Sequence, residues 1–145
     1  MADPAITLHR LHLQAVLDGI GRRDRRALMQ RLGRAVHADV QLRFRQGRAP
    51  DGSPWLPLKK PRRRGPGQPL RDTGRLQRSI TWQADAASAT IGTNVVYARA
   101  HNDGVPGAPV RLPQRRFLGI ARPQVELINR IADQWLQQVL DGHPA

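Results

Sequence analysis

The stretch LMQRLGRAVHADVQLRF, residues 28–44, carries an apolar residue at every fourth position. These positions hold Leu28, Leu32, Val36, Val40 and Phe44. This spacing places their side chains on one face of an α-helix, and such a face is normally buried against a core. The sequence therefore predicts a long amphipathic helix that begins near Asp24, where a carboxylate suits the positive end of the helix dipole. It must end before Arg48, because a proline turn follows.

The segments on either side extend this pattern. Residues 5–20 place Leu8, Leu11, Ala15 and Val16 at helical spacing, which predicts a first helix before the long one. After the long helix, Pro50-Asp51-Gly52 is a turn signal, since proline presets φ and glycine accepts a positive φ. Trp55 follows the turn, and we expect it to fold back onto the helix as a core residue.

The apolar period changes to two further along the chain. Residues 80–84 and 89–93 both alternate, which predicts an antiparallel hairpin with one buried face. Between this hairpin and the turn, Asp72 or Thr73 is expected to cap a short helix whose Leu76 and Ile80 face the core. A last helix is expected from about Pro123, with an apolar stripe that includes Trp135 and with Gly142 as its stop. The prediction is one α+β domain over residues 1–145, with N-terminal helices, a small antiparallel sheet and a C-terminal helix.

Composition narrows the possible functions. The formal net charge is +13, and 22 of the 24 basic residues are arginine. This charge implies attraction to an acidic partner, either nucleic acid or a protein surface. There is no cysteine, which excludes disulfides and thiolate metal sites. No apolar run approaches the roughly 20 residues that a membrane span needs, so we expect a soluble protein that is made in the cytoplasm.

The densest basic run lies at residues 59–64 and opens an exposed loop of about residues 59–69, rich in proline and glycine. Residues 59–78 contain 8 basic residues and one acid, a cluster that could neutralise several DNA phosphates. Aromatic residues are scarce, which argues against stacking on single-stranded bases. The residues proposed here for partner or DNA contact are Lys59, Lys60, Arg62, Arg63 and Arg64.

Signatures of an active site are weak. Asp72-Thr73-Gly74 is the tripeptide of aspartic proteases, but Arg75 follows it, and a cation there would work against the shared proton of a catalytic dyad. His9 and His12 lack a third metal ligand, as do His101 and Asp103. We therefore expect no catalytic, metal or cofactor site. A homodimeric protease remains a distant alternative.

The order of motifs resembles a known family. The series comprises Ala49-Pro50-Asp51-Gly52 with Trp55, Asp72-Thr73-Gly74-Arg75-Leu76, Ile91-Gly92-Thr93-Asn94 with Tyr97-Ala98, His101-Asn102-Asp103-Gly104, and Arg115-Arg116-Phe117-Leu118-Gly119. Over about residues 5–140 it is similar to the phage virion morphogenesis family, the tail-completion proteins of Mu-like phages. The basic loop departs from the family pattern.

The resemblance implies a structural, non-enzymatic protein of the virion neck. Such a protein would form a ring at the head–tail junction, with six copies as the natural number, and would dock to head connector and tail terminator or tube proteins. Arg115, Arg116 and Phe117 would then present an apolar anchor between exposed cations, although core packing of Phe117 and Leu118 is an equal alternative. The basic loop would contact a neighbouring subunit or line the DNA channel. The competing hypothesis is a small DNA-binding protein acting through residues 59–78.

Overall fold

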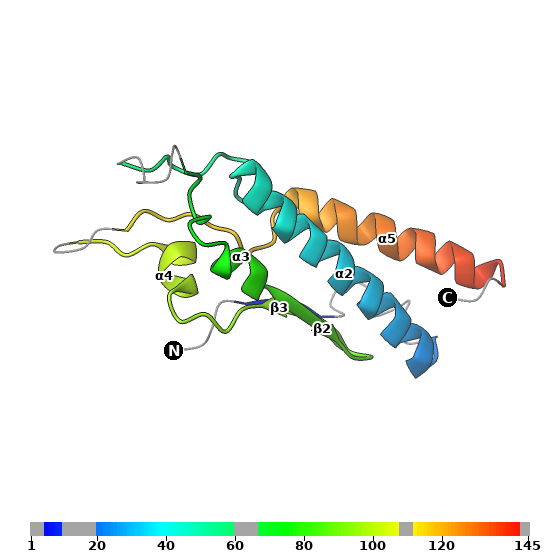
Figure 1. Cartoon of the computed structure of the whole chain (residues 1–145). Coiled ribbons are helices and arrows are strands. Elements are labelled where there is room, and N and C mark those ends of the chain that lie inside the picture. Colours follow the sequence, from blue (N-terminus) through cyan, green and yellow to red (C-terminus); the bar gives the residue numbers. More distant parts are fainter. Residues whose placement is uncertain (1–4, 10–19, 60–66, 108–111, 143–145) are drawn as a thin grey trace.

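A computed structural model describes residues 5–9, 20–59, 67–107 and 112–142. Two long helices lie beside each other and a small sheet lies across one of them (Figure 1). In chain order the elements are β1 (Ala5–His9), α2 (Arg22–Gln46), α3 (Arg75–Ser79), β2 (Thr81–Ala84), β3 (Ser88–Gly92), α4 (Ala98–Asp103) and α5 (Arg122–Leu140). The predicted α+β class is confirmed.

The sheet has three antiparallel strands in the order β1-β3-β2. The predicted hairpin is confirmed, with Trp82 opposite Ile91 and Ala84 opposite Ala89. The helix expected within residues 5–20 is wrong at its start, because Ala5–His9 form a strand that pairs with β3. The segment Ile6-Thr7-Leu8-His9 also alternates between apolar and polar residues, as a strand does. Its backbone N–H and C=O groups find their hydrogen-bond partners on the open edge of β3 rather than within a helix. Residues 10–19 lie outside the described residues.

Helix α2 provides the centre of the core. All five apolar residues of its predicted stripe are buried, at 2% exposure or less. The helix ends at Gly47, whose φ of 65° is the left-handed conformation that glycine adopts without strain. On one side α2 packs against β2 and β3, and on another it packs against α5, where Trp135 is fully buried. The predicted long helix, the C-terminal helix and the core position of Trp55 are confirmed.

The short helices differ in detail from the sequence prediction. Leu76 and Ile80 are buried as expected, but the residue that caps α3 is Gly74, with φ of 76°. Asp72 is therefore not the cap, and the Thr73 hydroxyl accepts the Arg75 N–H at 3.2 Å from one position further out. A side chain at the cap would sit against Arg78, whose Nη1 lies 2.7 Å from an ideal Cβ on Gly74. Glycine thus takes the place that a capping side chain was expected to hold.

Close packing between α2 and the sheet makes Gly33 a sensitive position. A methyl group there would lie 2.7 Å from Cε3 of Trp82 and 3.4 Å from Cβ of Ala89. Alanine normally favours a helix over glycine by about 1 kcal/mol, whereas overpacking costs about 1–3 kcal/mol. We expect Gly33→Ala to lower the free energy of unfolding in urea by about 1 kcal/mol. The exposed Gln30→Ala is the control, and a Gly33→Ala variant more stable than wild type would contradict this packing.

Candidate functional site

The turn that follows α2, residues 49–53, is fixed by its own hydrogen bonds. Ala49 N donates to Ser53 O at 2.8 Å, and Gly52 N donates to Ala49 O at 2.9 Å. The Asp51 carboxylate accepts bonds from the Ser53 hydroxyl at 2.6 Å and from the Ser53 N–H at 2.9 Å. These bonds hold the pKa of Asp51 below its usual value, with a smaller contribution from the charge of Arg116. The turn therefore presents an ionised carboxylate at neutral pH.

A second segment, residues 114–121, lies against this turn. The indole Nε1 of Trp55 donates to the carbonyl of Arg116 at 2.8 Å. The guanidinium of Arg115 donates to the carbonyls of Leu56 and Pro57, at 2.8 and 3.0 Å. Both donors have low exposure, Trp55 at 7% and Arg115 at 6%. The two motifs that are about 60 residues apart in sequence are thus held together by bonds shielded from water.

A buried arginine on α2 supports the same segment. Arg43 is 3% exposed, and its Nη1 donates to the carbonyl of Phe117 at 2.7 Å. Its Nη2 forms an ion pair with Asp39 one turn earlier, also at 2.7 Å. Burial lowers the pKa of the Arg43 guanidinium from its ordinary value, and the carboxylate of Asp39 opposes that shift. The pair joins the core helix to the backbone of residues 114–121.

Two buried amides complete the support. The Asn102 carboxamide oxygen on α4 accepts the N–H groups of Phe117 and Leu118, at 3.1 and 2.9 Å. The Gln124 amide at the start of α5 donates to the carbonyl of Pro50 at 2.9 Å and to Asp39 at 3.2 Å. Gln124 also accepts the N–H of Ala121 at 2.8 Å. Side chains from α2, α4 and α5 therefore fix both segments at once.

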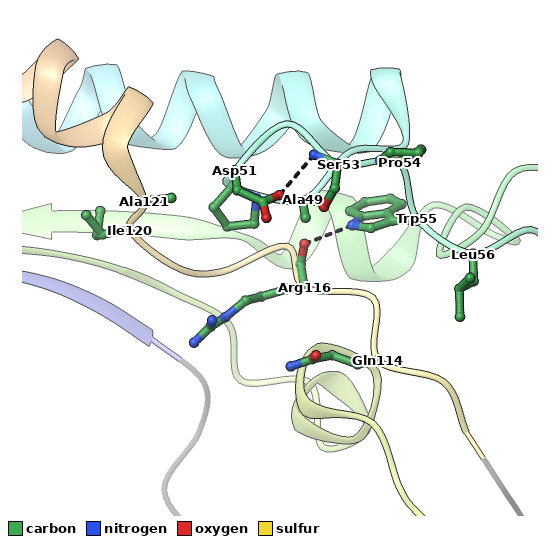
Figure 2. Close-up of a pocket in the computed structure, with 11 residues that line it drawn as sticks. Ala49, Asp51, Ser53, Pro54, Trp55, Leu56, Gln114, Arg116, Ile120 and Ala121 are labelled. Carbon is green, nitrogen blue, oxygen red and sulfur yellow. Dashed lines mark hydrogen bonds between the residues drawn. The ribbon is translucent and has the colours of Figure 1, made fainter.

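Between the two segments lies a hollow of about 300 Å³ (Figure 2). Leu56 and Ile120 stand at its two ends and are 57% and 41% exposed. Asp51 and Arg116 add exposed charges of opposite sign, so the lining mixes apolar and polar groups. The complete lining is Ala49, Pro50, Asp51, Ser53, Pro54, Trp55, Leu56, Gln114, Arg116, Ile120 and Ala121. Such a rigid, mixed and open surface suits a protein contact better than chemistry on a small substrate.

Comparison with known protein families gives this geometry its context. The model of the phage virion morphogenesis family matches residues 7–137. The chain belongs to this family. Its members take part in building the phage particle, so the chain has a structural or assembly role in a virion. No curated protein and no solved structure matches the chain.

The surroundings of Asp72 bear on the aspartic-protease alternative. Asp72 of this family member lies in the bend before α3 and not after an apolar strand. Asp72 lines a hollow of about 570 Å³ together with Arg75 and Arg115, and within the described part of that lining it is the single acidic side chain, whereas a protease dyad needs two. Among the described residues, no group of three potential metal ligands occurs, and no helix is long and apolar enough to cross a membrane.

The predicted contact residues of this family member fall into three groups. Lys59 is exposed, while Lys60, Arg62, Arg63 and Arg64 lie outside the described residues. Arg116 is exposed as expected. Arg115 and Phe117 are buried, so the expected exposure of Arg115 is wrong and core packing accounts for the position of Phe117. The reason is that residues 115–118 find hydrogen-bond partners in Arg43 of α2, in Asn102 of α4 and in the segment 55–57. Whether any of these residues touches a partner stays a prediction.

The sequence reading missed the supporting side chains Asp39, Arg43, Asn102 and Gln124. One signal was available, because Asp39 and Arg43 are four residues apart on a predicted helix, a spacing at which ion pairs form. Arg43 is also three residues after Val40 and seven after Val36, a spacing that places it on the apolar face. Asn102 and Gln124 bond backbone atoms 15 and 74 residues away, and no local pattern reveals such contacts.

Proposed function

We propose that this chain is a tail-completion or neck protein, a structural component of the phage head–tail junction. Membership of the virion morphogenesis family supports a role in particle assembly. The rigid exposed hollow between residues 49–56 and 114–121 supports docking to a neighbouring protein. In this proposal the chain forms a homo-oligomeric ring, with six copies to match the sixfold symmetry of tails. It would meet the head connector on one side and tail terminator or tube proteins on the other.

The hollow is the main support for the proposal, because hydrogen bonds already fix the backbone around it. Association loses free energy when surface groups must be ordered on contact, and a pre-ordered surface avoids that loss. Here the backbone carbonyls of Pro50, Arg116 and Phe117 are already held by side chains with low exposure. The exposed Leu56 and Ile120 then offer apolar area beside the charges of Asp51 and Arg116. This combination of an apolar centre with charged groups at its edge is typical of protein interfaces.

The DNA-binding alternative through residues 59–78 is a separate proposal, and it rests on charge alone. Most of its basic run lies outside the described residues. The hollow is formed by residues 49–56 and 114–121, so the two proposals concern different parts of the chain. Replacing Arg62, Arg63 and Arg64 by glutamine separates the two ideas. Loss of DNA affinity with normal particle assembly would favour the alternative, and heads and tails that form but fail to join would favour the neck.

The docking surface is tested directly by the double substitution Leu56→Glu with Ile120→Glu in a phage that depends on this gene. Both side chains are exposed, so the chain should fold with unchanged stability. Two buried carboxylates without partners in the interface should lower the yield of joined particles by at least about tenfold. Counting free heads, free tails and joined particles by electron microscopy provides the measurement.

A matched control is available at the other end of the molecule. Leu140 is 72% exposed and is the last residue of α5, whereas Ala121, which lines the hollow, directly precedes the first residue of that helix. Leu140→Glu adds a carboxylate to an exposed apolar site, and we expect it to leave joining intact. Normal joining in the double variant, or equal loss in the control, would contradict docking through the hollow.

A further inference from the structure

The exposed face of α2 carries a straight row of arginines, none of which lines the hollow. Arg23, Arg34 and Arg45 are all exposed, and each is separated from the next by 11 residues. Eleven residues make almost three whole helical turns, so the three side chains leave the helix in nearly the same direction. At 1.5 Å per residue, neighbouring members of the row are about 16.5 Å apart, and the whole row is about 33 Å long. We refer to these three residues as the arginine row.

Within the described residues the arginine row has no acidic partner, although the guanidinium carbon of Arg34 lies 5.9 Å from the ring centroid of Trp82 on β2. The residues of α2 between its members on this face are neutral, and Gln30 and Ala38 among them are exposed. The acidic residues of α2 are Asp24 and Asp39, both half-buried, and Asp39 is committed to Arg43. Within the described part of the chain, no member of the row forms an ion pair.

Three other arginines of the same helix, Arg22, Arg26 and Arg31, face polar partners elsewhere in the fold. Arg31 donates to Gln138 of α5 at 2.8 Å. Arg22 and Arg26 lie close enough to Asp85 in the β2–β3 turn to lower the pKa of its carboxyl, after the larger effect of two backbone N–H bonds. Among the described residues, the members of the row differ from Arg22, Arg26 and Arg31 in having no acidic or amide partner, while Arg34 lies over the ring of Trp82.

The short helix α3 widens the basic surface. Gln41 of α2 donates to the carbonyl of Gln77 at 3.0 Å, and the amide of Gln77 donates back to Gln41 at 3.2 Å. This contact holds α3 beside α2 in the interval between Arg34 and Arg45. Arg75 and Arg78 of α3 are both exposed, so they add two cations to that flank. The surface as a whole attracts a polyanion.

The spacing of the row selects the kind of polyanion. A line drawn along one side of duplex DNA, parallel to its axis, crosses one strand and then the other once in each turn of about 34 Å. Phosphates therefore meet such a line about every 17 Å on average, and the length of an arginine side chain can absorb the unequal groove widths. We propose that the arginine row binds the phosphate backbone of duplex DNA, with α2 lying along the duplex.

Arginine is suited to this contact, because its planar guanidinium donates two parallel hydrogen bonds to phosphate oxygens. Contacts to phosphates alone carry no sequence information, so the binding is independent of base sequence and falls as salt rises. This inference does not depend on the head–tail junction, since it can be measured on the purified chain. It also assigns DNA contact to a helix rather than to the basic loop.

The test uses the purified full chain and a fluorescently labelled 30-base-pair duplex, with affinity measured by anisotropy across a range of salt concentrations. The triple variant Arg23→Gln, Arg34→Gln, Arg45→Gln should bind at least about tenfold more weakly at 0.1 M salt, because it loses three phosphate contacts. Each lost contact also makes the plot of log K against log salt less steep by about 0.9. The magnitude of this negative slope should therefore decrease by about 2.7. The triple lysine variant at the same positions should retain most of the binding.

The matched control removes the same charge elsewhere. Arg99→Gln, Arg122→Gln, Arg130→Gln changes three exposed arginines, two of which are paired with Asp103 and Glu126. Glutamine is a good helix former, and circular dichroism checks that both variants fold. Equal loss in the control would show a response to net charge alone and would overturn the proposal.

Polyglutamate provides the probe for an acidic protein. Polyglutamate binding that depends on the row while duplex binding does not, or duplex binding lost only when residues 59–64 are neutralised, would also overturn it.

Discussion

Replacing Phe117 by alanine is expected to lower the free energy of unfolding of the isolated chain by about 3–5 kcal/mol. The Phe117 side chain is fully buried, and its ring centroid lies 5.3 Å from that of Phe44 on α2. Trp55 also packs against Phe44 in a T-shaped arrangement, with ring centroids 5.6 Å apart, so removing one ring leaves a cavity in an aromatic cluster. Urea unfolding monitored by tryptophan fluorescence measures the loss.

The size of this effect distinguishes the two interpretations of residues 115–118. A side chain that serves as an exposed anchor for a partner would contribute little to the stability of the free chain. Arg116→Ala is the adjacent control, since Arg116 is exposed and only its carbonyl is bonded to Trp55. We expect a change within about 0.5 kcal/mol for it. A Phe117→Ala variant with stability near that of wild type would contradict the buried position.

Replacing Arg43 by methionine is expected to lower the free energy of unfolding by about 3 kcal/mol. Methionine fills much of the volume but makes none of the three hydrogen bonds, so Asp39 loses its ion pair and the carbonyl of Phe117 loses its donor. The effect is set near the low end of the range for buried pairs, because the side chain of Asp39 is 25% exposed and keeps part of its hydration. Urea unfolding again gives the value.

Two residues further along α2, Arg45 provides a matched control. It is exposed, so Arg45→Met removes the same charge from the same helix at little cost, within about 0.5 kcal/mol. The double variant Arg43→Met with Asp39→Asn should be less destabilised than the sum of the two single variants, since each single change leaves a charge without its partner. Equal losses for Arg43→Met and Arg45→Met would show that the buried pair contributes nothing specific.

Much of the fold follows from local pattern. The period of four in residues 28–44 is read correctly because α2 buries one continuous face, and the period of two in residues 80–93 is read correctly because β3 buries alternate residues. The turn at Pro50-Asp51-Gly52 is equally local, since its bonds join residues at most four apart. In each case the residues that determine the structure are close in sequence.

Failures occur where distant residues decide the outcome. Residues 5–9 form a strand because β3 offers an open edge about 83 residues away, which no local spacing reveals. Arg115 is buried because the carbonyls of Leu56 and Pro57 accept hydrogen bonds from its guanidinium, whereas its charge alone suggested a surface position. The hollow between residues 49–56 and 114–121 likewise exists only through contacts that span the chain. The family motifs were visible in order, but their meeting in space was not.

The central proposal is that the chain is a structural ring at the head–tail junction, docked through the hollow. High-resolution electron microscopy of a phage particle carrying this chain, with the density at the junction traced, is its most direct test. The proposal predicts a ring of this chain between connector and tail, with a neighbouring protein seated against Leu56 and Ile120. A particle that lacks the chain, holds it elsewhere, or leaves the hollow facing solvent in an assembled ring would contradict it.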